Sequence, residues 1–415
     1  MNHIYKQKYK LYKQKYIIAK IKNTVILTPD SIAIVDYLNK LNYKVSNIKN
    51  PKQIYLLSKI FSNTYNNISN ENITQEKYDV DIKNKYLDNH NTFLDEKIKQ
   101  DLDIIDNLQT TCYKYNNQQL IIQTNYSKYI PVVKLIYCLL KITNYTDKCI
   151  LGLYPSIMKK MFPNNNQPIT PYNINSGFTL PYSHSIIFRK EEIIKVTIHE
   201  LLHQIGVNLN IVINKNSIDK FFKYKKNDDI LIDEAYVEFY ACIINLLYIK
   251  TIYNLDDGIL MKLLSYELQF SMLQLAKLLL HFNIYDYNDF YPQCHLLNNN
   301  NNNNNPNCIS SNKVNINSHY MCANTTHPES YIIIKTAMLY YMDETLDILT
   351  KNGKNIFYPN NNKTNNNDII NYILDICGRE SFVNSINEII KLYNNNKNNT
   401  FIKETCRLTC IETFM

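Results

Sequence analysis

The chain has 415 residues, of which 45% are hydrophobic and 20% are charged, so it can bury a substantial core. Its 45 basic and 37 acidic side chains give a formal net charge of +8. We expect no transmembrane segment, because no uninterrupted apolar run reaches the length that a bilayer requires. The longest candidate, Ile259–Phe282, contains three charged side chains and predicts a buried core helix.

Residues 1–22 form a basic segment with seven lysines, whereas the first acidic residue is Asp30. We expect a solvated tail. The alternative is contact with nucleic acid or an anionic surface, since lysines release counterions when they bind phosphates. The apolar stretch at residues 17–19 is too short for the core of a signal peptide. We therefore expect an intracellular protein whose 10 cysteines are mostly reduced.

The next segments predict a small α/β region followed by a linker. Thr24–Leu27 predicts a strand, Pro29 the start of a helix, and Lys52–Phe61 a second helix. Residues 62–110 are polar and poorly periodic, which indicates a connection to the main domain.

The main domain begins with strands and leads to a buried helix. Leu120–Gln123 and Cys149–Leu153 predict strands on either side of a helix at Val132–Ile142, and Ser185–Arg189 predicts a further strand. Lys190–Glu192 then places two acids where the first turn of a helix is expected. The residues that follow are apolar around most of the helix circumference up to a stop at Gly206, as expected of a buried helix.

This predicted helix carries two histidines and a glutamate at the spacing of a zinc site. His199 and His203 lie one turn apart on the same face, so both can bind one metal ion. Glu200 lies beside the first histidine, where it can take a proton from a metal-bound water. About 0.007 such matches are expected by chance in a chain of this composition. The alternative is a structural pair of histidines, but three polar groups on a buried helix need partners, and one metal ion supplies them.

A catalytic zinc usually takes three protein ligands and leaves one position for water. Leu209 occupies the position where one class of zinc protease has a third histidine, so the third ligand must come from elsewhere. Glu234, on the next predicted helix, is our assignment, with Glu238 one turn later accepting a hydrogen bond from a ligand histidine. Asp233 is the fallback ligand, and a solvated acidic face is the alternative.

The segment Asp233–Glu238 resembles the Asn-Glu-Ala-x-x-Asp motif of the gluzincins, zinc metallopeptidases that pair HExxH with a distal glutamate; the last acid is one methylene longer here. Asn175–Thr179 and Ile186–Glu200 also resemble segments of uncharacterised metallopeptidase-like proteins of large DNA viruses, and the likeness covers roughly residues 148–250. It implies a zincin-like α+β fold, with a small mixed sheet beside the active-site helix and a mostly helical C-terminal part. It also implies a location in the host cytoplasm or the virion.

The resemblance implies hydrolysis of peptide bonds in a peptide or protein substrate. Zinc lowers the pKa of its water to about 7, Glu200 takes the proton, and the same carboxylate passes it to the leaving nitrogen. Tyr331, with His327 beside it, is the candidate donor to the oxyanion, although His327 can equally cap a helix that begins there. Two alternatives remain: an inactive zincin-like scaffold, and a nucleic-acid or anionic-surface binding protein that acts through residues 1–22.

Asparagine runs mark the expected boundaries. Lysine, asparagine, isoleucine and tyrosine have A/T-rich codons, so runs such as Asn298–Asn305 indicate codon drift in exposed loops. We divide the chain into a basic tail (1–22), an N-terminal α/β region (23–63), a polar linker (64–110), a zincin-like catalytic core (111–294), an asparagine-rich insertion (295–313), a helical C-terminal part (314–395) and a tail (396–415).

Overall fold

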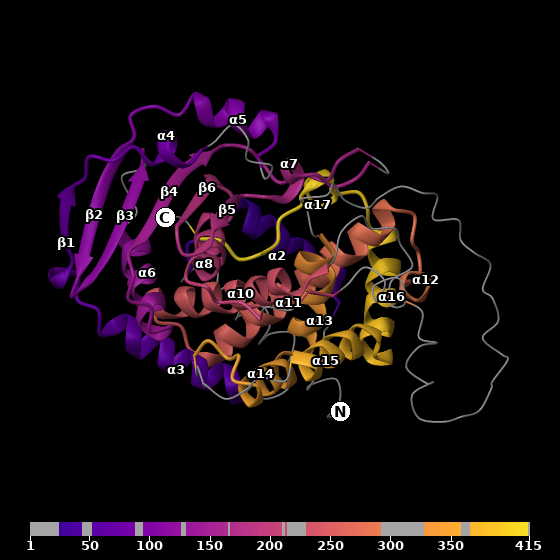
Figure 1. The fold of residues 1–415 in the computed structure, drawn as a ribbon. Coiled ribbons are helices and arrows are strands. Elements are labelled where there is room, and N and C mark those ends of the chain that lie inside the picture. Colours follow the sequence, from indigo (N-terminus) through magenta and orange to yellow (C-terminus); the bar gives the residue numbers. More distant parts are fainter. Residues whose placement is uncertain are drawn as a thin grey trace.

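The computed structural model describes residues 25–43, 52–87, 94–125, 130–164, 167–209, 212–213, 230–291, 328–357 and 366–413. Its strands confirm a mixed sheet, in the order β1-β2-β3-β4-β6-β5 (Figure 1). The β3–β4 and β4–β6 pairs are parallel, and the other three pairs are antiparallel. The strands are β1 (Thr74–Lys77), β2 (Gln109–Tyr115), β3 (Gln118–Thr124), β4 (Cys149–Ser156), β5 (Gly177–Leu180) and β6 (His184–Arg189).

Helices cover both faces of this sheet because its central strands are apolar on both sides. In β6, Ile187 packs into the main core, whereas Ile186 and Phe188 pack into a smaller cluster on the opposite face. The main-core face carries α6 (Ile130–Ile142) and α8 (Ile193–Gln204). The opposite face carries α4 (Ile82–Tyr86) and α5 (Glu96–Asp103).

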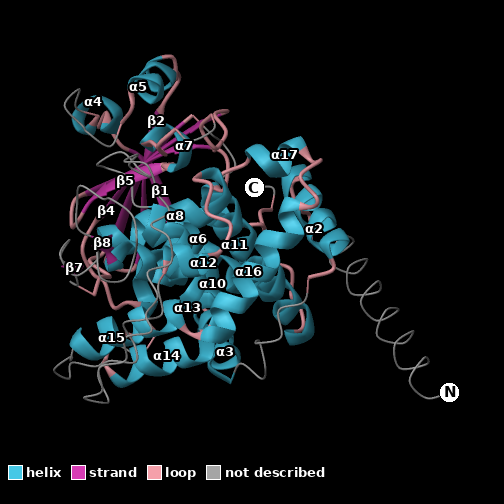
Figure 2. Cartoon of the chain, turned by 90° about the vertical axis from the view of Figure 1, so that its right-hand side faces the viewer, coloured by secondary structure: helices cyan, strands magenta, loops and turns pink. Residues whose placement is uncertain are grey.

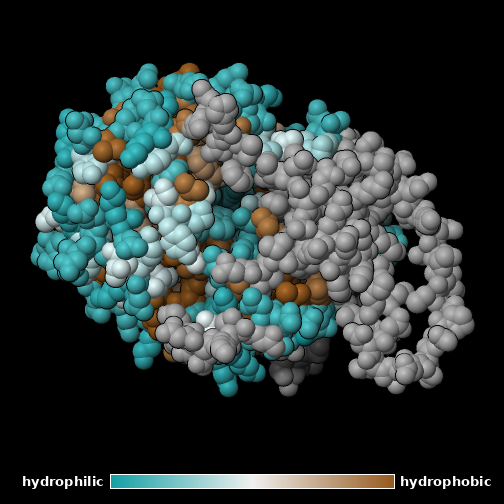
Figure 3. Space-filling model, viewed as in Figure 1, coloured by the Kyte–Doolittle hydropathy of each residue, from teal (hydrophilic) through white to brown (hydrophobic). Residues whose placement is uncertain are grey.

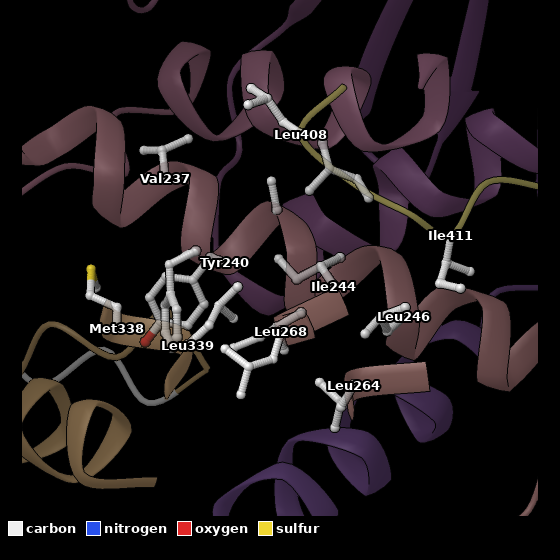
Figure 4. Packing of buried hydrophobic residues seen from close by; sticks show 14 of the residues in the cluster. Val237, Tyr240, Ile244, Leu246, Leu264, Leu268, Met338, Leu339, Leu408 and Ile411 are labelled. Carbon is white, nitrogen blue, oxygen red and sulfur yellow. The ribbon is translucent and has the colours of Figure 1, made fainter. Parts of the chain in front are cut away.

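Most of the rest of the described chain is helical, and Figure 2 shows that helices make up most of the molecule. Two long helices, α10 (Ile232–Ile252) and α11 (Asp257–His281), form the centre of the core. Figure 4 shows their apolar side chains packed near Leu339 and Ile411. The surrounding elements are α2 (Pro29–Leu41), α3 (Lys52–Asn66), α12 (Tyr287–Phe290), the π-helix η3 (Glu329–Ile334), α13 (Lys335–Tyr340), α14 (Met342–Lys351), α15 (Asn366–Gly378) and α16 (Glu380–Asn394).

Among the described residues, α10 is the one helix long and apolar enough to cross a bilayer by length and composition. Its apolar window is 83% buried inside the protein, and the helix also carries the buried side chains of Glu238 and Asn245. Its hydrophobicity is therefore accounted for by packing on nearly all sides. The coloured part of Figure 3 is mostly hydrophilic, with hydrophobic residues in small groups.

Several predicted elements are confirmed: β3, β4, β6, α6, α8 and α11 occupy the expected positions. Gly206 ends α8 with a positive φ of 74°, as expected of a glycine stop. The strand expected at Thr24–Leu27 is not formed in its described part, where Leu27 makes an isolated bridge to Thr413. Lys190–Glu192 precedes α8 instead of forming its first turn, because Glu192 has a left-handed φ of 60° and pairs with buried Lys160.

Two segments differ from the expected linker and tail. Residues 64–110 contribute β1 to the sheet and place α4 and α5 on its outer face. Residues 396–413 include α17 (Thr400–Glu404) and then run through the interior as the C-terminal segment, which we define as Thr405–Thr413. The division into domains stays a prediction, and residues 1–22, the insertion at 295–313 and His327 lie outside the described residues.

Buried carboxylates hold the C-terminal segment in place. The main-chain amide of Leu408 donates to Oε1 of Glu192 at 2.8 Å, and that of Cys410 donates to Oε2 of Glu267 at 3.1 Å. Leu408 and Ile411 then pack beside α10 (Figure 4). The C-terminal segment thus packs against α10, one of the two helices that carry the predicted site.

Candidate metal centre

The predicted zinc helix is α8, which packs between the edge of the sheet and α10. It places His199 and His203 on the same face, with their Nε2 atoms 3.2 Å apart and their rings 4.8 Å apart between centroids. His199 is 7% exposed, whereas the side chain of His203 is 17% exposed. The two imidazoles therefore meet at the boundary between the core and the surface.

Two local contacts bring the start of α10 to the end of α8. The strand β8 (Ile230–Leu231) leads directly into α10 and pairs with β7 (Val212–Ile213), which follows α8. The carboxylate of Asp233 accepts a hydrogen bond of 2.7 Å from the main-chain amide of Leu209. Asp233 thus anchors the connection between the helices, and it does not belong to the cluster that His199 and His203 form with Glu234.

Glu234 lies in the first turn of α10 and completes a cluster of three donor groups. Its Oε2 lies 3.2 Å from Nε2 of His203 and 3.5 Å from Nε2 of His199. These three donor atoms all lie within 4.8 Å of one another. The structure therefore brings together the three residues that the sequence predicts as metal ligands.

Glu238 and Lys195 support the cluster from inside the protein. Oε2 of Glu238 lies 3.0 Å from Nδ1 of His199, and its Oε1 forms an ion pair with Nζ of Lys195. The side chains of Glu238 and Lys195 are only 1% and 2% exposed. Burial raises the pKa of Glu238, but Lys195 and His199 more than offset this, so its pKa lies below the usual range. A charged Glu238 favours a proton on Nδ1 of His199, which leaves Nε2 free to bind a metal.

The electrostatics of the cluster favour a bound cation. Burial lowers the pKa of His199, but Glu234 and Glu238 more than reverse this and raise it to about 9. Burial also opposes ionisation of Glu234, yet the two histidines hold its pKa well below 4.5. The carboxylates thus stabilise positive charge at the imidazoles, whether it is supplied by a proton or by a metal.

Glu200 lies next to the cluster but is not part of it. Its Oε2 accepts a hydrogen bond of 2.8 Å from the hydroxyl of Thr179 on β5. Gly177 on the same strand passes so close that a Cβ there would lie 2.8 Å from Oε1 of Glu200. Burial raises the pKa of Glu200, while His199 and His203 act in the opposite direction. The predicted general base is therefore held in place by the edge strand.

Tyr331 lies beside His199, with 6.0 Å between the ring centroids. It belongs to η3, a π-helix that begins next to Pro328, and π-helical turns often occur at functional sites. Burial raises the pKa of Tyr331 well above 10, helped by Glu234, to which the tyrosine is hydrogen-bonded. Tyr331 is thus a protonated donor at the site, in agreement with its predicted place.

Sequence reasoning did not identify Lys195 and Thr179 as site residues. A signal for Lys195 was present, because it precedes His199 by four residues and therefore shares its helix face. Thr179 gave no comparable signal, because its contact with Glu200 depends on how β5 packs against α8.

Comparison with known proteins gives one distant relationship. The chain is 27% identical over 238 residues to an uncharacterised protein of Acanthamoeba polyphaga mimivirus, over 55% of this chain and 53% of that protein. The chain therefore spans about half the length of this relative. No family model and no solved structure matches the sequence.

Proposed function

We propose that this protein is a zinc metallopeptidase in which His199, His203 and Glu234 hold the metal and Glu200 is the general base. The observation that carries the proposal is the convergence of two imidazole nitrogens and one carboxylate oxygen from two helices. We further propose that it acts inside the cell and is related to proteins of large DNA viruses.

The spacing of the donor atoms fits zinc. Zinc bound tetrahedrally at 2.0–2.1 Å separates its ligand atoms by about 3.3 Å. The three separations here are 3.2, 3.2 and 3.5 Å. Two imidazoles and one carboxylate also form a ligand set used by catalytic zinc, which leaves a fourth position for water. Glu238 behind His199 supplies the carboxylate that commonly orients such a ligand.

When bound, zinc supplies a Lewis acid that polarises a carbonyl group and lowers the pKa of water to about 7. The proton of the attacking water is transferred by a side chain of the protein. Glu200, held by Thr179, takes the proton of the attacking water on its carboxylate and passes it to the leaving nitrogen of the peptide bond. Tyr331 offers a hydroxyl toward the negative charge that develops on the carbonyl oxygen.

The test combines metal analysis with peptide cleavage by the purified full-length protein. We expect one zinc per chain in the wild type and in Glu200→Gln, and cleavage by the wild type only, with a loss of about a thousandfold in the variant. His203→Gln should lose the metal. Glu96→Gln on the exposed side of α5 is the control and should match the wild type. Equal activity in Glu200→Gln would exclude its role as the base, and bound zinc without any cleavage would favour an inactive scaffold.

A further inference from the structure

A small cavity lies on the Glu200 side of the candidate metal centre. Its volume is about 40 Å³, and His199, Glu200 and Tyr331 form the wall that faces the site. His203 and Glu234 do not line it. The cavity therefore adjoins the proposed general base and lies away from the exposed side of the metal ligands.

Two further parts of the cavity wall come from segments that are far apart in sequence. The turn Ile174–Gly177 leads into the edge strand, and Leu408 belongs to the C-terminal segment. Buried Arg189 fixes the turn by donating to the main-chain oxygen of Asn175 at 2.8 Å. Leu408 is fixed through its amide, which is bound by Glu192. Both walls are thus held by buried charged groups, so the cavity cannot widen without breaking those contacts.

The size of the cavity limits its contents. A volume near 40 Å³ holds about three water molecules, because one water needs roughly 10–15 Å³ of cavity space measured in this way. A side chain of one or two heavy atoms fits this space. Leucine or phenylalanine does not fit unless Leu408 or Ile174 moves, and both are nearly fully buried.

The cavity is lined by both polar and apolar groups, and each lysine in its wall is paired with a carboxylate. Two lysines line the cavity, and each is paired: Lys160 with Glu192 at 2.7 Å, and Lys195 with Glu238. Ser176 is only 4% exposed, and its hydroxyl has no hydrogen-bond partner among the described residues. A buried hydroxyl of this kind is stabilised by a ligand that offers a donor or an acceptor.

We infer that this cavity receives the substrate side chain that follows the scissile bond and selects serine or alanine there, with serine preferred. The inference rests on the proposed function. Glu200 delivers a proton to the leaving nitrogen, so the residue that carries this nitrogen must lie against Glu200, which lines the cavity. The small volume selects against large side chains, and Ser176 offers its hydroxyl to a serine.

The test uses the zinc-loaded full-length protein and a series of peptides that differ only in the residue after the cleaved bond: serine, alanine, leucine, phenylalanine or aspartate. We expect kcat/KM to be about fivefold higher for serine than for alanine. We expect values for leucine, phenylalanine and aspartate at least about tenfold below that for alanine. A wild type that prefers any of these three residues would overturn the inference while leaving the proposed function intact.

Two variants test the walls separately. Leu408→Ala enlarges the cavity and should raise the leucine-to-alanine ratio of kcat/KM about tenfold or more. Ile411→Ala removes comparable packing from the same segment without touching the cavity, so it should leave that ratio unchanged. Ser176→Ala removes an unpartnered hydroxyl, which keeps the fold, and should abolish the preference for serine over alanine. Unchanged preferences in both cavity variants would overturn the assignment.

A binding measurement separates failure of this inference from failure of the proposed function. The same peptides are titrated calorimetrically into zinc-loaded Glu200→Gln. Tighter binding of the serine and alanine peptides supports the cavity assignment even if the wild type cleaves nothing, in which case only the proposed activity fails. Equal binding of all five peptides, or binding of none, overturns the assignment.

Discussion

The hydroxyl of Thr179 lies 2.8 Å from Oε2 of Glu200, so the edge strand of the sheet holds the proposed general base. The hydroxyl oxygen of Thr179 also lies 3.0 Å from the main-chain carbonyl oxygen of Glu200 and 2.9 Å from Oγ of Ser185 on β6. Ser185 in turn lies 3.1 Å from that carbonyl. Two strands and α8 are therefore joined through hydroxyl groups beside the proposed general base.

Removing this hydroxyl should lower activity without affecting metal binding. Thr179→Val keeps the shape of the side chain but loses the donor, so the Glu200 carboxylate gains rotational freedom. We expect kcat to fall about 10- to 100-fold with an unchanged zinc content. Thr179→Ser restores the donor and should recover most of the rate. A valine variant with full activity would contradict the positioning role of Thr179.

A methyl group at Gly177 should displace Glu200. A Cβ at this position would lie 2.8 Å from Cγ and Oε1 of Glu200 and also 2.8 Å from the main-chain oxygen of Ile186, closer than real Cβ contacts. We expect Gly177→Ala to retain zinc and to lose activity about 100-fold. Gly258→Ala is the matched control, because its Cβ would meet only Asp256 at 3.2 Å in the first turn of α11. Similar activity in both variants would exclude the predicted displacement.

Lys195 should stabilise both the fold and the metal ligand. Lys195→Met leaves the carboxylate of Glu238 buried without its cation, which costs about 3 kcal/mol. Because Glu238 orients His199, zinc affinity should also fall about 10- to 100-fold. Urea unfolding and competition with a zinc chelator measure the two effects. The double variant Lys195→Met/Glu238→Gln removes the buried charge and should recover stability but not zinc affinity; a single variant as stable as the wild type would contradict this account.

Lys277 should make stability depend on pH in the alkaline range. It is buried in α11, and burial lowers its pKa from 10.5 to about 7. The folded state therefore favours the neutral amine, whereas the unfolded chain keeps it charged up to its ordinary pKa. The wild type should gain stability relative to Lys277→Met as the pH rises from 7 toward 10, by about 1.4 kcal/mol per pKa unit of difference at most. A constant difference in unfolding free energy across this range would contradict the buried position.

The sequence predicted the parts of the site that local periodicity encodes. His199 and His203 share a helix face because they are four residues apart, and Glu234 follows from the acidic start of the next apolar helix. The strand before α8 could likewise be predicted, because Ile186–Phe188 is a short run of apolar, β-branched and aromatic residues. These predictions depend on neighbours within one or two turns of the chain.

The parts that were missed depend on contacts between distant segments. Residues 396–415 read as a tail because their composition is mixed and their anchors, Glu192 and Glu267, lie well over 100 residues away. The acids at Glu191 and Glu192 read as a helix start, whereas buried cations hold them: Arg407 lies 3.8 Å from Glu191 and Lys160 lies 2.7 Å from Glu192. Ion pairs of this kind leave no periodic pattern in either partner segment.

The most direct test of the central claim is anomalous X-ray scattering at the zinc absorption edge from crystals of the full-length protein. The account predicts one strong peak at about 2.0–2.2 Å from Nε2 of His199, Nε2 of His203 and the Glu234 carboxylate. A zinc-replete crystal with no peak there, or with the peak bound by other residues, would contradict it.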